Sequence, residues 1–246
     1  MKRRLFVSIG GAAALAGCAR ISNAVNDNGL VHSIIGAAQP LDHALIGTHG
    51  RVRTYRESDI DADFRIDSLD TPSDSHYRDL VKTDYAGYRL VVDGAVEAKQ
   101  VFALAELRAM QTYSEITRHD CVEGWSAIGK WAGVPLATVL AMAKPTPATR
   151  YVVFHCFDRD SGGQPYYESL DLHEAAHPQT VLALALNDRP LEPDHGAPVR
   201  LRVPTQLGYK SAKWVYRVEL ADSFRAIHGG NGGYWEDQGY EWYAGI

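Results

Sequence analysis

Residues 118–126, Arg-His-Asp-Cys-Val-Glu-Gly-Trp-Ser, and residues 131–136, Trp-Ala-Gly-Val-Pro-Leu, are the most informative part of this sequence. They place Cys121 at the end of a segment predicted to be extended, beside polar and aromatic residues. Such a cysteine, taken alone, is most simply an inert core thiol. A thiol-protease nucleophile with His119 or His155 as its base is a second interpretation. Neither interpretation accounts for the rest of the chain.

The two segments resemble the molybdenum-binding segment of the sulfite-oxidase family of molybdopterin oxidoreductases. Further matching segments follow in the family's order and spacing, at residues 154–156, 169–178, 194–201, 203–204, 208–214 and 233–236. The combination is more specific than any one segment. The resemblance covers residues 60–246 and implies the fold class: α+β, a strand-rich mixed fold of the sulfite-oxidase molybdopterin-binding type.

Composition excludes several other classes of protein. Of 246 residues, 46% are hydrophobic and 22% are charged, which excludes wholesale disorder and a coiled coil. There are 25 Lys and Arg against 30 Asp and Glu, a net charge of −5, so no nucleic-acid partner is expected. Three cysteines cannot form a disulfide framework in a chain of this length. One large domain or two small ones fit the length.

The N-terminus predicts export. A basic start at residues 2–4 precedes an apolar run at residues 5–17 that is too short to span a bilayer, as in a secretory signal. Arg3-Arg4-Leu5-Phe6-Val7 resembles a twin-arginine signal, and Leu15-Ala16-Gly17-Cys18 resembles a lipobox with Cys18 as the lipidated residue. An ordinary secretory signal with a chance cysteine is the alternative. We expect a periplasmic protein that contacts a membrane only through a lipid on Cys18. The predicted divisions are a signal peptide at 1–17, a polar lead-in at 18–59 and the molybdopterin-binding domain at 60–246.

Within residues 60–246, residue patterns predict a mixture of strands and helices. Alternation or apolar runs predict strands at 88–94, 114–121, 151–156, 199–203 and 213–220, and helices at 103–110, 135–143 and 178–186, with a polar loop at 204–212. These elements agree with an α+β body.

The resemblance implies a molybdenum–molybdopterin cofactor with Cys121 as the protein ligand of the metal. A soft thiolate suits the sulfur-rich ligand set of this metal, and Glu123 is placed to exchange protons there. The residues that the resemblance assigns to the pterin or its phosphate are Arg65, Asp67, Ser68, Cys156, His195, Arg200, Lys210, Ser211, Ala212 and Lys213. A phosphate requires local cations in an acidic chain.

Plainer interpretations of these residues remain open at the level of sequence. Glu123 is alternatively a buried, hydrogen-bonding carboxylate, and Cys156 a residue that only packs within its strand. Lys210 and Lys213 are alternatively on a solvated strand face, and Asp67 in an ordinary polar loop.

The resemblance implies an exported enzyme that transfers an oxygen atom with two electrons, by sulfoxide or N-oxide reduction or by sulfite-type oxidation. Asp120 and His195 replace the Arg and Asn typical of the protein-methionine-sulfoxide reductase branch, so the substrate stays open. The sequence contains no Cys-x-x-Cys-His haem motif. We therefore expect a separate electron-transfer partner, such as a membrane haem protein.

Two other functions compete with this interpretation. His173-Glu174-Ala175-Ala176-His177 matches the pattern of zinc peptidases, in which two histidines one helical turn apart hold the metal and the glutamate is the base. Pro178 disfavours a helical conformation at His177, which argues against that site. The other alternative is a binding lipoprotein that keeps the fold without the cofactor.

Overall fold

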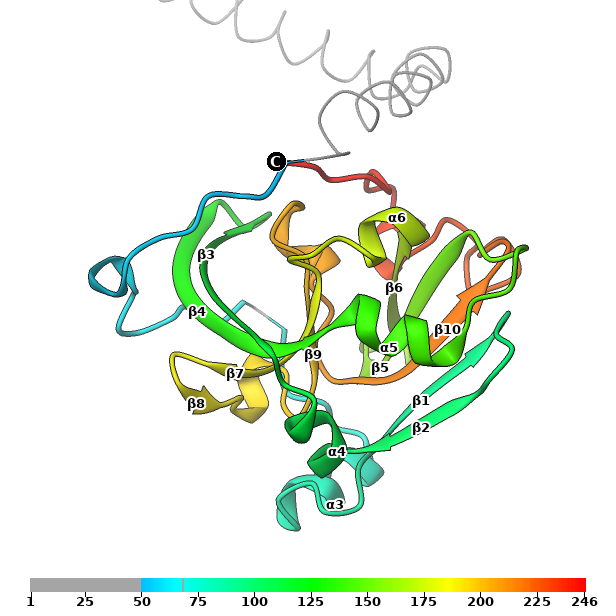
Figure 1. Cartoon of the computed structure of the whole chain (residues 1–246), viewed down its shortest axis with the longest axis horizontal. Coiled ribbons are helices and arrows are strands. Elements are labelled where there is room, and N and C mark those ends of the chain that lie inside the picture. The colour runs from blue at the N-terminus through cyan, green and yellow to red at the C-terminus, as the bar shows by residue number, and fades with distance from the viewer. Residues whose placement is uncertain (1–49, 68) are drawn as a thin grey trace, which may run out of the picture. The chain divides into compact units, whose positions relative to one another are not determined.

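The strands in the described part of the chain form two sheets. The structure is a computed structural model that describes residues 50–67 and 69–246 (Figure 1). In the first sheet the order is β2 (Gln100–Ala103), β1 (Arg89–Gly94), β10 (Val215–Ala221), β5 (Tyr151–Arg159) and β6 (Pro165–Asp171). In the second the order is β3 (Tyr113–Cys121), β4 (Trp125–Pro135), β7 (Val181–Leu186) and β8 (Arg189–Pro190), and β9 (Arg200–Arg202) also pairs with β7. Only β1 and β10 pair in parallel; the other named strand pairs are antiparallel.

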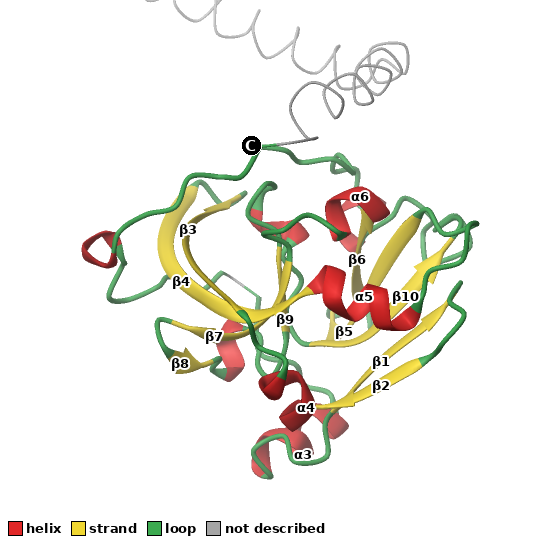
Figure 2. Cartoon of the chain, in the orientation of Figure 1, coloured by secondary structure: helices red, strands yellow, loops and turns green. Residues whose placement is uncertain are grey.

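The helices are short (Figure 2). They are α3 (Ser75–Lys82), α4 (Leu104–Ala109), α5 (Leu136–Ala143), α6 (Leu172–Ala175) and α7 (Tyr234–Asp237), with single 3-10 turns η1 (Glu57–Asp59), η2 (Pro193–His195) and η3 (Gly208–Lys210). Helices α4, α5 and α6 connect strands, α3 precedes β1 and α7 follows β10. In α5 the buried residues recur with helical spacing, and Pro135 is its N-cap. No helix within residues 50–67 and 69–246 has the length and apolar character needed to cross a bilayer. Together with the two sheets, these helices confirm a strand-rich α+β fold.

Most of the predicted elements are confirmed. The strands at 88–94, 114–121, 151–156, 199–203 and 213–220 correspond to β1, β3, β5, β9 and β10, and the helices at 103–110 and 135–143 to α4 and α5. The prediction of a helix at 178–186 is wrong, because the run Val181–Leu186 is strand β7. Five of its six residues are buried, and it lies between β4 on one side and β8 and β9 on the other. A short apolar run buried on both faces carries no periodicity that separates strand from helix.

The β3–β4 hairpin positions the cysteine singled out by the sequence. The two strands pair from Tyr113 opposite Gly133 to Cys121 opposite Trp125. The turn closes with a hydrogen bond of 3.1 Å from the Gly124 N–H to the Cys121 carbonyl. Gly124 has φ +84, a left-handed conformation that glycine adopts without strain. Cys121 is therefore the last residue of β3, directly before a tight turn.

The segment before the first sheet runs beside this hairpin. The Tyr55 N–H donates to the Ile116 carbonyl at 2.9 Å, and the Asp61 N–H donates to the Ile128 carbonyl at 3.0 Å. The Ile128 N–H in turn donates to the Asp61 carboxylate at 2.6 Å. These hydrogen bonds hold the segment that precedes Asp67 against β3 and β4. The predicted signal, Cys18 and the lead-in up to residue 49 lie outside the described residues.

Candidate active site

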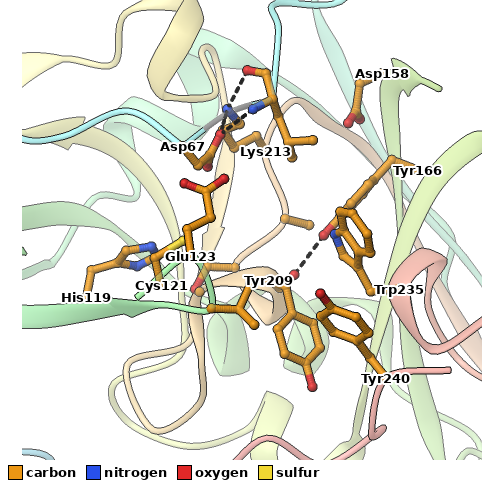
Figure 3. Close-up of a pocket in the computed structure, with 15 residues that line it drawn as sticks. Asp67, His119, Cys121, Glu123, Asp158, Tyr166, Tyr209, Lys213, Trp235 and Tyr240 are labelled. Carbon is orange, nitrogen blue, oxygen red and sulfur yellow. Dashed lines mark hydrogen bonds and ion pairs between the residues drawn. The ribbon is translucent and has the colours of Figure 1, made fainter. Parts of the chain in front are cut away.

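A cavity of about 260 Å³ opens at the end of the β3–β4 hairpin (Figure 3). One side is built by the hairpin end and the segment around Asp67, and the other by β5, β6, the loop between β9 and β10, and the C-terminal segment. Its lining residues include Asp67, His119, Cys121, Val122, Glu123, Asp158, Tyr166, Tyr209, Ser211, Ala212, Lys213, Trp235 and Tyr240.

Cys121 lies at this cavity half-buried, as a free cysteine. Burial raises the pKa of its thiol, and the backbone N–H of Glu123 opposes that rise by hydrogen bonding. Glu123 is exposed in the turn, where Trp125 Nε1 donates to its Oε2 at 2.9 Å. The interpretation of Glu123 as a buried carboxylate is therefore wrong. A sulfur and a carboxylate lie together at one side of the cavity.

Buried cations lie behind that side. Lys213 Nζ donates to Asp67 Oδ1 at 2.5 Å and to the Leu69 and Asp194 carbonyls at 3.3 and 3.2 Å. Arg200 lies 3.9 Å from the same Asp67 carboxylate, and its Nε is buried with no hydrogen-bond partner among the described residues. Burial lowers the pKa of both cations, and Asp67 opposes the shift. Asp67 thus joins the N-terminal segment to two cations of the β9–β10 region.

His119 contributes a neutral ring. Its side chain is buried, and its Nδ1 has no hydrogen-bond partner among the described residues. Burial first, and then the charges of Arg202, Arg200 and Lys213, hold its pKa well below the usual value. Gly208 packs against the ring, since a Cβ there would lie 2.6 Å from His119 Nε2. At neutral pH the histidine is therefore an uncharged hydrogen-bonding group.

Aromatic side chains form the opposite wall. The Tyr166 hydroxyl donates to the Tyr209 carbonyl at 2.8 Å, and the rings of Trp235 and Tyr240 stack with centroids 5.2 Å apart. Two apolar lining residues remain open to solvent, Val122 with 44% and Tyr240 with 40% of their surface exposed. The cavity therefore combines a polar, sulfur-bearing wall with an aromatic one.

The structure brings together half of the residues predicted for the site. Asp67, Cys121, Glu123, Ser211, Ala212 and Lys213 line the cavity, and Arg200 is joined to it through Asp67. Lys213 is 3% exposed and Lys210 fully buried, so the interpretation of both as solvated strand residues is wrong. Ser68 lies outside the described residues.

The other predicted residues lie elsewhere. Cys156 is buried in β5 opposite Val215. Arg65 is exposed, with its guanidinium 5.2 Å above the Trp125 ring. Lys210 Nζ donates to the buried carboxylates of Glu168 and Glu236 rather than facing the cavity.

His195 lines a second cavity of about 330 Å³. There, His195 Nε2 lies 3.1 Å from the Phe64 carbonyl oxygen. His195 still has a link to the first site, since Arg200 donates to its carbonyl at 3.3 Å. Arg200 therefore contacts both His195, which lines the second cavity, and Asp67, which lines the first.

Sequence reasoning missed Asp158 and the aromatic wall. Asp158 follows Cys156 by two residues in β5, so both side chains lie on one face of the strand. That spacing was the available signal. Tyr209 and Trp235 lie in the family-like segments 208–214 and 233–236, but the wall that their rings form appears only when the folded chain brings β6, η3 and the C-terminal segment together.

The zinc-peptidase pattern does not form a metal site. Helix α6 ends at Ala175, so His177 lies beyond it, as Pro178 suggested. The Glu174 carboxylate is buried and accepts a hydrogen bond from the Thr205 hydroxyl. Within residues 50–67 and 69–246, no group of three or more His, Cys, Asp or Glu side chains is arranged to hold a metal ion.

Comparisons with known proteins agree on one family. The family model described as an oxidoreductase molybdopterin binding domain matches residues 77–226. A putative protein-methionine-sulfoxide reductase subunit, YedZ1 of Azospira oryzae, is 37% identical to this chain, over 99% of the chain and 87% of that relative. The crystal structure of the sulfane dehydrogenase SoxCD from Paracoccus pantotrophus is similar, with a TM-score of 0.50 and 25% identity over 56% of this chain. The chain spans 39% of that SoxCD chain's length.

Proposed function

This chain belongs to the family of oxidoreductases with a molybdopterin-binding domain, and from that premise we propose that it reduces sulfoxides at a molybdenum centre held by Cys121. The observation that carries the proposal is the Cys121 thiol at a cavity backed by buried cations. The overall reaction consumes two electrons and two protons, and it converts the sulfoxide into a thioether and water.

The residues present fit a molybdopterin. His119 Nδ1 and Arg200 Nε are buried polar atoms without partners among the described residues, and such atoms are rare unless a ligand or water completes them. The pterin ring offers several hydrogen-bonding groups, and its side chain ends in a phosphate. Ser211, Ala212 and Lys213 line the same cavity as His119 and add backbone groups and a cation.

When bound, the cofactor supplies the two-electron redox chemistry of the metal. Cys121 would hold the metal through its sulfur, a soft ligand suited to a sulfur-rich set. Arg200 and Lys213 would hold the phosphate, with Asp67 fixing the positions of both cations. Glu123 is oriented at the cavity by Trp125 and would deliver a proton to the oxygen of the bound sulfoxide.

The walls of the cavity favour a neutral sulfoxide over the sulfite anion. Its lining includes three carboxylates, Asp67, Glu123 and Asp158, and its lysine is already paired with Asp67. With Arg200 and Lys213 engaged by the phosphate of the cofactor, an anionic substrate would be repelled by the carboxylates that remain. The apolar substituents of a neutral sulfoxide would instead pack against aromatic rings such as Trp235 and Tyr240. The relative from Azospira oryzae is named as a protein-methionine-sulfoxide reductase subunit, which agrees with this substrate class.

We also propose that the enzyme works outside the cytoplasm with a separate electron donor. Support for export comes from the twin-arginine-like start, and support for a lipid anchor from Cys18. A folded, cofactor-loaded protein needs this kind of export route. The relative named above is called a subunit, which supports a separate partner, and we propose a membrane haem protein in that role.

Metal and pterin analysis of the purified full chain tests the proposal. We expect about one molybdenum and one pterin per chain, and reduction of a methyl sulfoxide by a dye donor but no oxidation of sulfite. Cys121→Ser is expected to lower molybdenum content and to reduce the rate by more than about 100-fold, since even indirect metal contacts are worth about 10- to 100-fold. Cys156→Ser is the matched control, because this thiol lies outside the cavity. Zinc without pterin, or full molybdenum in Cys121→Ser, would overturn the proposal.

A further inference from the structure

Arg202 of β9 reaches a strand with which β9 does not pair. Strands β3 and β9 are outer strands of the second sheet and are separated in it by β4 and β7. Arg202 Nη2 nevertheless donates to the Arg118 carbonyl of β3 at 2.6 Å and to the Thr117 hydroxyl at 3.3 Å. The sheet curves along β3 and β4 (Figure 1), and this side chain joins two of its outer strands.

The acceptor that Arg202 completes lies on the free edge of β3. Ile128 is opposite Arg118 in the hairpin, and it turns its N–H and its carbonyl outward to Asp61. Residues opposite each other in an antiparallel pair point their backbone groups either both inward or both outward. The Arg118 carbonyl therefore points away from β4, and the guanidinium of Arg202 pairs with it three residues before Cys121.

This is an unfavourable position for a charge. Arg202 is 1% exposed, its two partners are neutral oxygen atoms, and its Nε has no partner among the described residues. Burial, and then the like charge of Arg200, lower the pKa of Arg202 to about 9. Both guanidiniums lie 5.4 Å from the centroid of the Trp131 ring, whose negative face offsets part of this cost. For stability alone, an apolar side chain would serve as well.

The two strands that Arg202 joins carry the two ends of the proposed cofactor site. Strand β3 ends at Cys121, the proposed ligand of the metal. Strand β9 begins at Arg200, two residues before Arg202 and on the same face of the strand. A cofactor held by Cys121 at its metal and by Arg200 at its phosphate requires a fixed separation between these strands.

We infer that Arg202 is a positioning residue: by bonding β9 to the free edge of β3, it sets the separation between the metal-binding and the phosphate-binding strand. The inference rests on the proposed function, because it requires a cofactor held by Cys121 and Arg200. Arg202 acts through the two strands and need not touch the cofactor. Its loss should loosen the hairpin end and weaken retention of the cofactor, while the rest of the fold stays intact.

Two variants of the full chain test this role. Arg202→Met removes the donors and the charge, and Arg202→Lys keeps a cation that can still donate to the Arg118 carbonyl. In cofactor-free Arg202→Met we expect the amides of residues 113–125 to exchange with deuterium about fivefold faster or more, the ratio that corresponds to about 1 kcal/mol. Residues 89–94 of β1 should exchange as in the wild type. Pterin content per chain should fall by a similar factor, and Arg202→Lys should recover much of both losses.

Global stability separates positioning from a general structural role. The midpoint of urea unfolding of cofactor-free Arg202→Met should stay close to that of the wild type, because removal of an unpaired buried charge offsets the lost hydrogen bond. Arg89→Met is the matched control. Arg89 is an exposed arginine of β1 that donates to the Tyr88 carbonyl at 2.7 Å and lines neither cavity described above. It should change neither the exchange of residues 113–125 nor the pterin content.

The outcomes distinguish this inference from the proposed function. Wild-type protein without pterin would contradict the proposed function itself. A loaded wild type with an equally loaded Arg202→Met, or with unchanged exchange in residues 113–125 of that variant, would overturn only the role of Arg202. A lower unfolding midpoint with faster exchange throughout both sheets would also overturn it, because the arginine would then support the fold in general.

Discussion

Asp158 gives the cofactor-free chain a distinctive pH dependence. Its pKa in the fold is about 7 against an ordinary value of 3.8, so the folded chain keeps a proton that the unfolded chain has lost. Stability contributed by this group therefore falls as the pH rises from about 4 to 7. Between pH 5 and pH 8 the loss amounts to about 2–3 kcal/mol. Urea unfolding of cofactor-free wild type and Asp158→Asn at both pH values should show this loss in the wild type only. The same change in unfolding free energy between the two pH values in both proteins would contradict this prediction.

Individual residues of the site differ in how far the sequence reveals them. Cys121 and Lys213 lie in motifs, so a family resemblance assigns them directly. Asp158 is followed by Arg159 and Asp160 and looks like the start of a polar turn. Its burial comes from the packing of distant segments around the cavity, including Tyr166 and Lys213. The two-residue spacing from Cys156 indicates a shared strand face, but the sequence does not show that these distant segments enclose it.

The contact between β4 and β7 depends on one glycine. A Cβ at Gly133 would lie 2.1 Å from the Leu182 carbonyl oxygen and 2.8 Å from Ala183 Cα, both of them backbone atoms of the neighbouring strand. Gly133→Ala should therefore force the strands apart and destabilise the chain by about 1–3 kcal/mol, as overpacking in a core does. Chemical denaturation followed by fluorescence measures this change. Gly87→Ala is the control, since its Cβ would meet only Leu80 Cδ2 at 3.6 Å. Equal stability of the two variants would contradict the prediction.

Whether a strand or helix can be predicted from the sequence depends on how regularly its apolar residues are spaced. Strand β1 alternates and ends in a glycine turn, and α5 buries residues with helical spacing, so both were predicted correctly. The run Val181–Leu186 has no polar face, and its identity as a strand is set by the neighbours that pair with it. The loop at 204–212 was predicted from its polar residues, and the structure buries most of them.

For the molecule as a whole, a buried charge cluster ties three distant segments together. Lys210 of η3 lies between Glu168 of β6 and Glu236 of α7, and all three side chains are almost fully buried. Burial raises the pKa of Glu168, and the Lys210 ammonium counteracts that rise. The cluster holds the loop that carries Tyr209, Ser211 and Ala212, so it also shapes one side of the cavity.

Removing the central cation of this cluster should destabilise the whole fold. Lys210→Met leaves two carboxylates buried together, and breaking a buried ion pair in this way costs about 3–5 kcal/mol. We expect the midpoint of urea unfolding to fall accordingly, and the pterin content to fall with it because the loop is no longer held. The triple variant Glu168→Gln, Lys210→Met, Glu236→Gln removes the charges as well and should recover much of the stability.

An exposed ion pair provides the comparison for this cluster. Lys82→Met removes a cation that pairs with Asp79 at 2.8 Å on the surface of α3, where both side chains are about 70% exposed. Exposed pairs contribute little to stability because water and salt screen them, so this variant should unfold close to the wild type. If Lys210→Met also unfolded like the wild type, the buried cluster would not hold the three segments together. The position of the loop beside the cavity would then have to depend on backbone contacts such as the hydrogen bond from the Leu201 N–H to the Ala212 carbonyl at 2.8 Å.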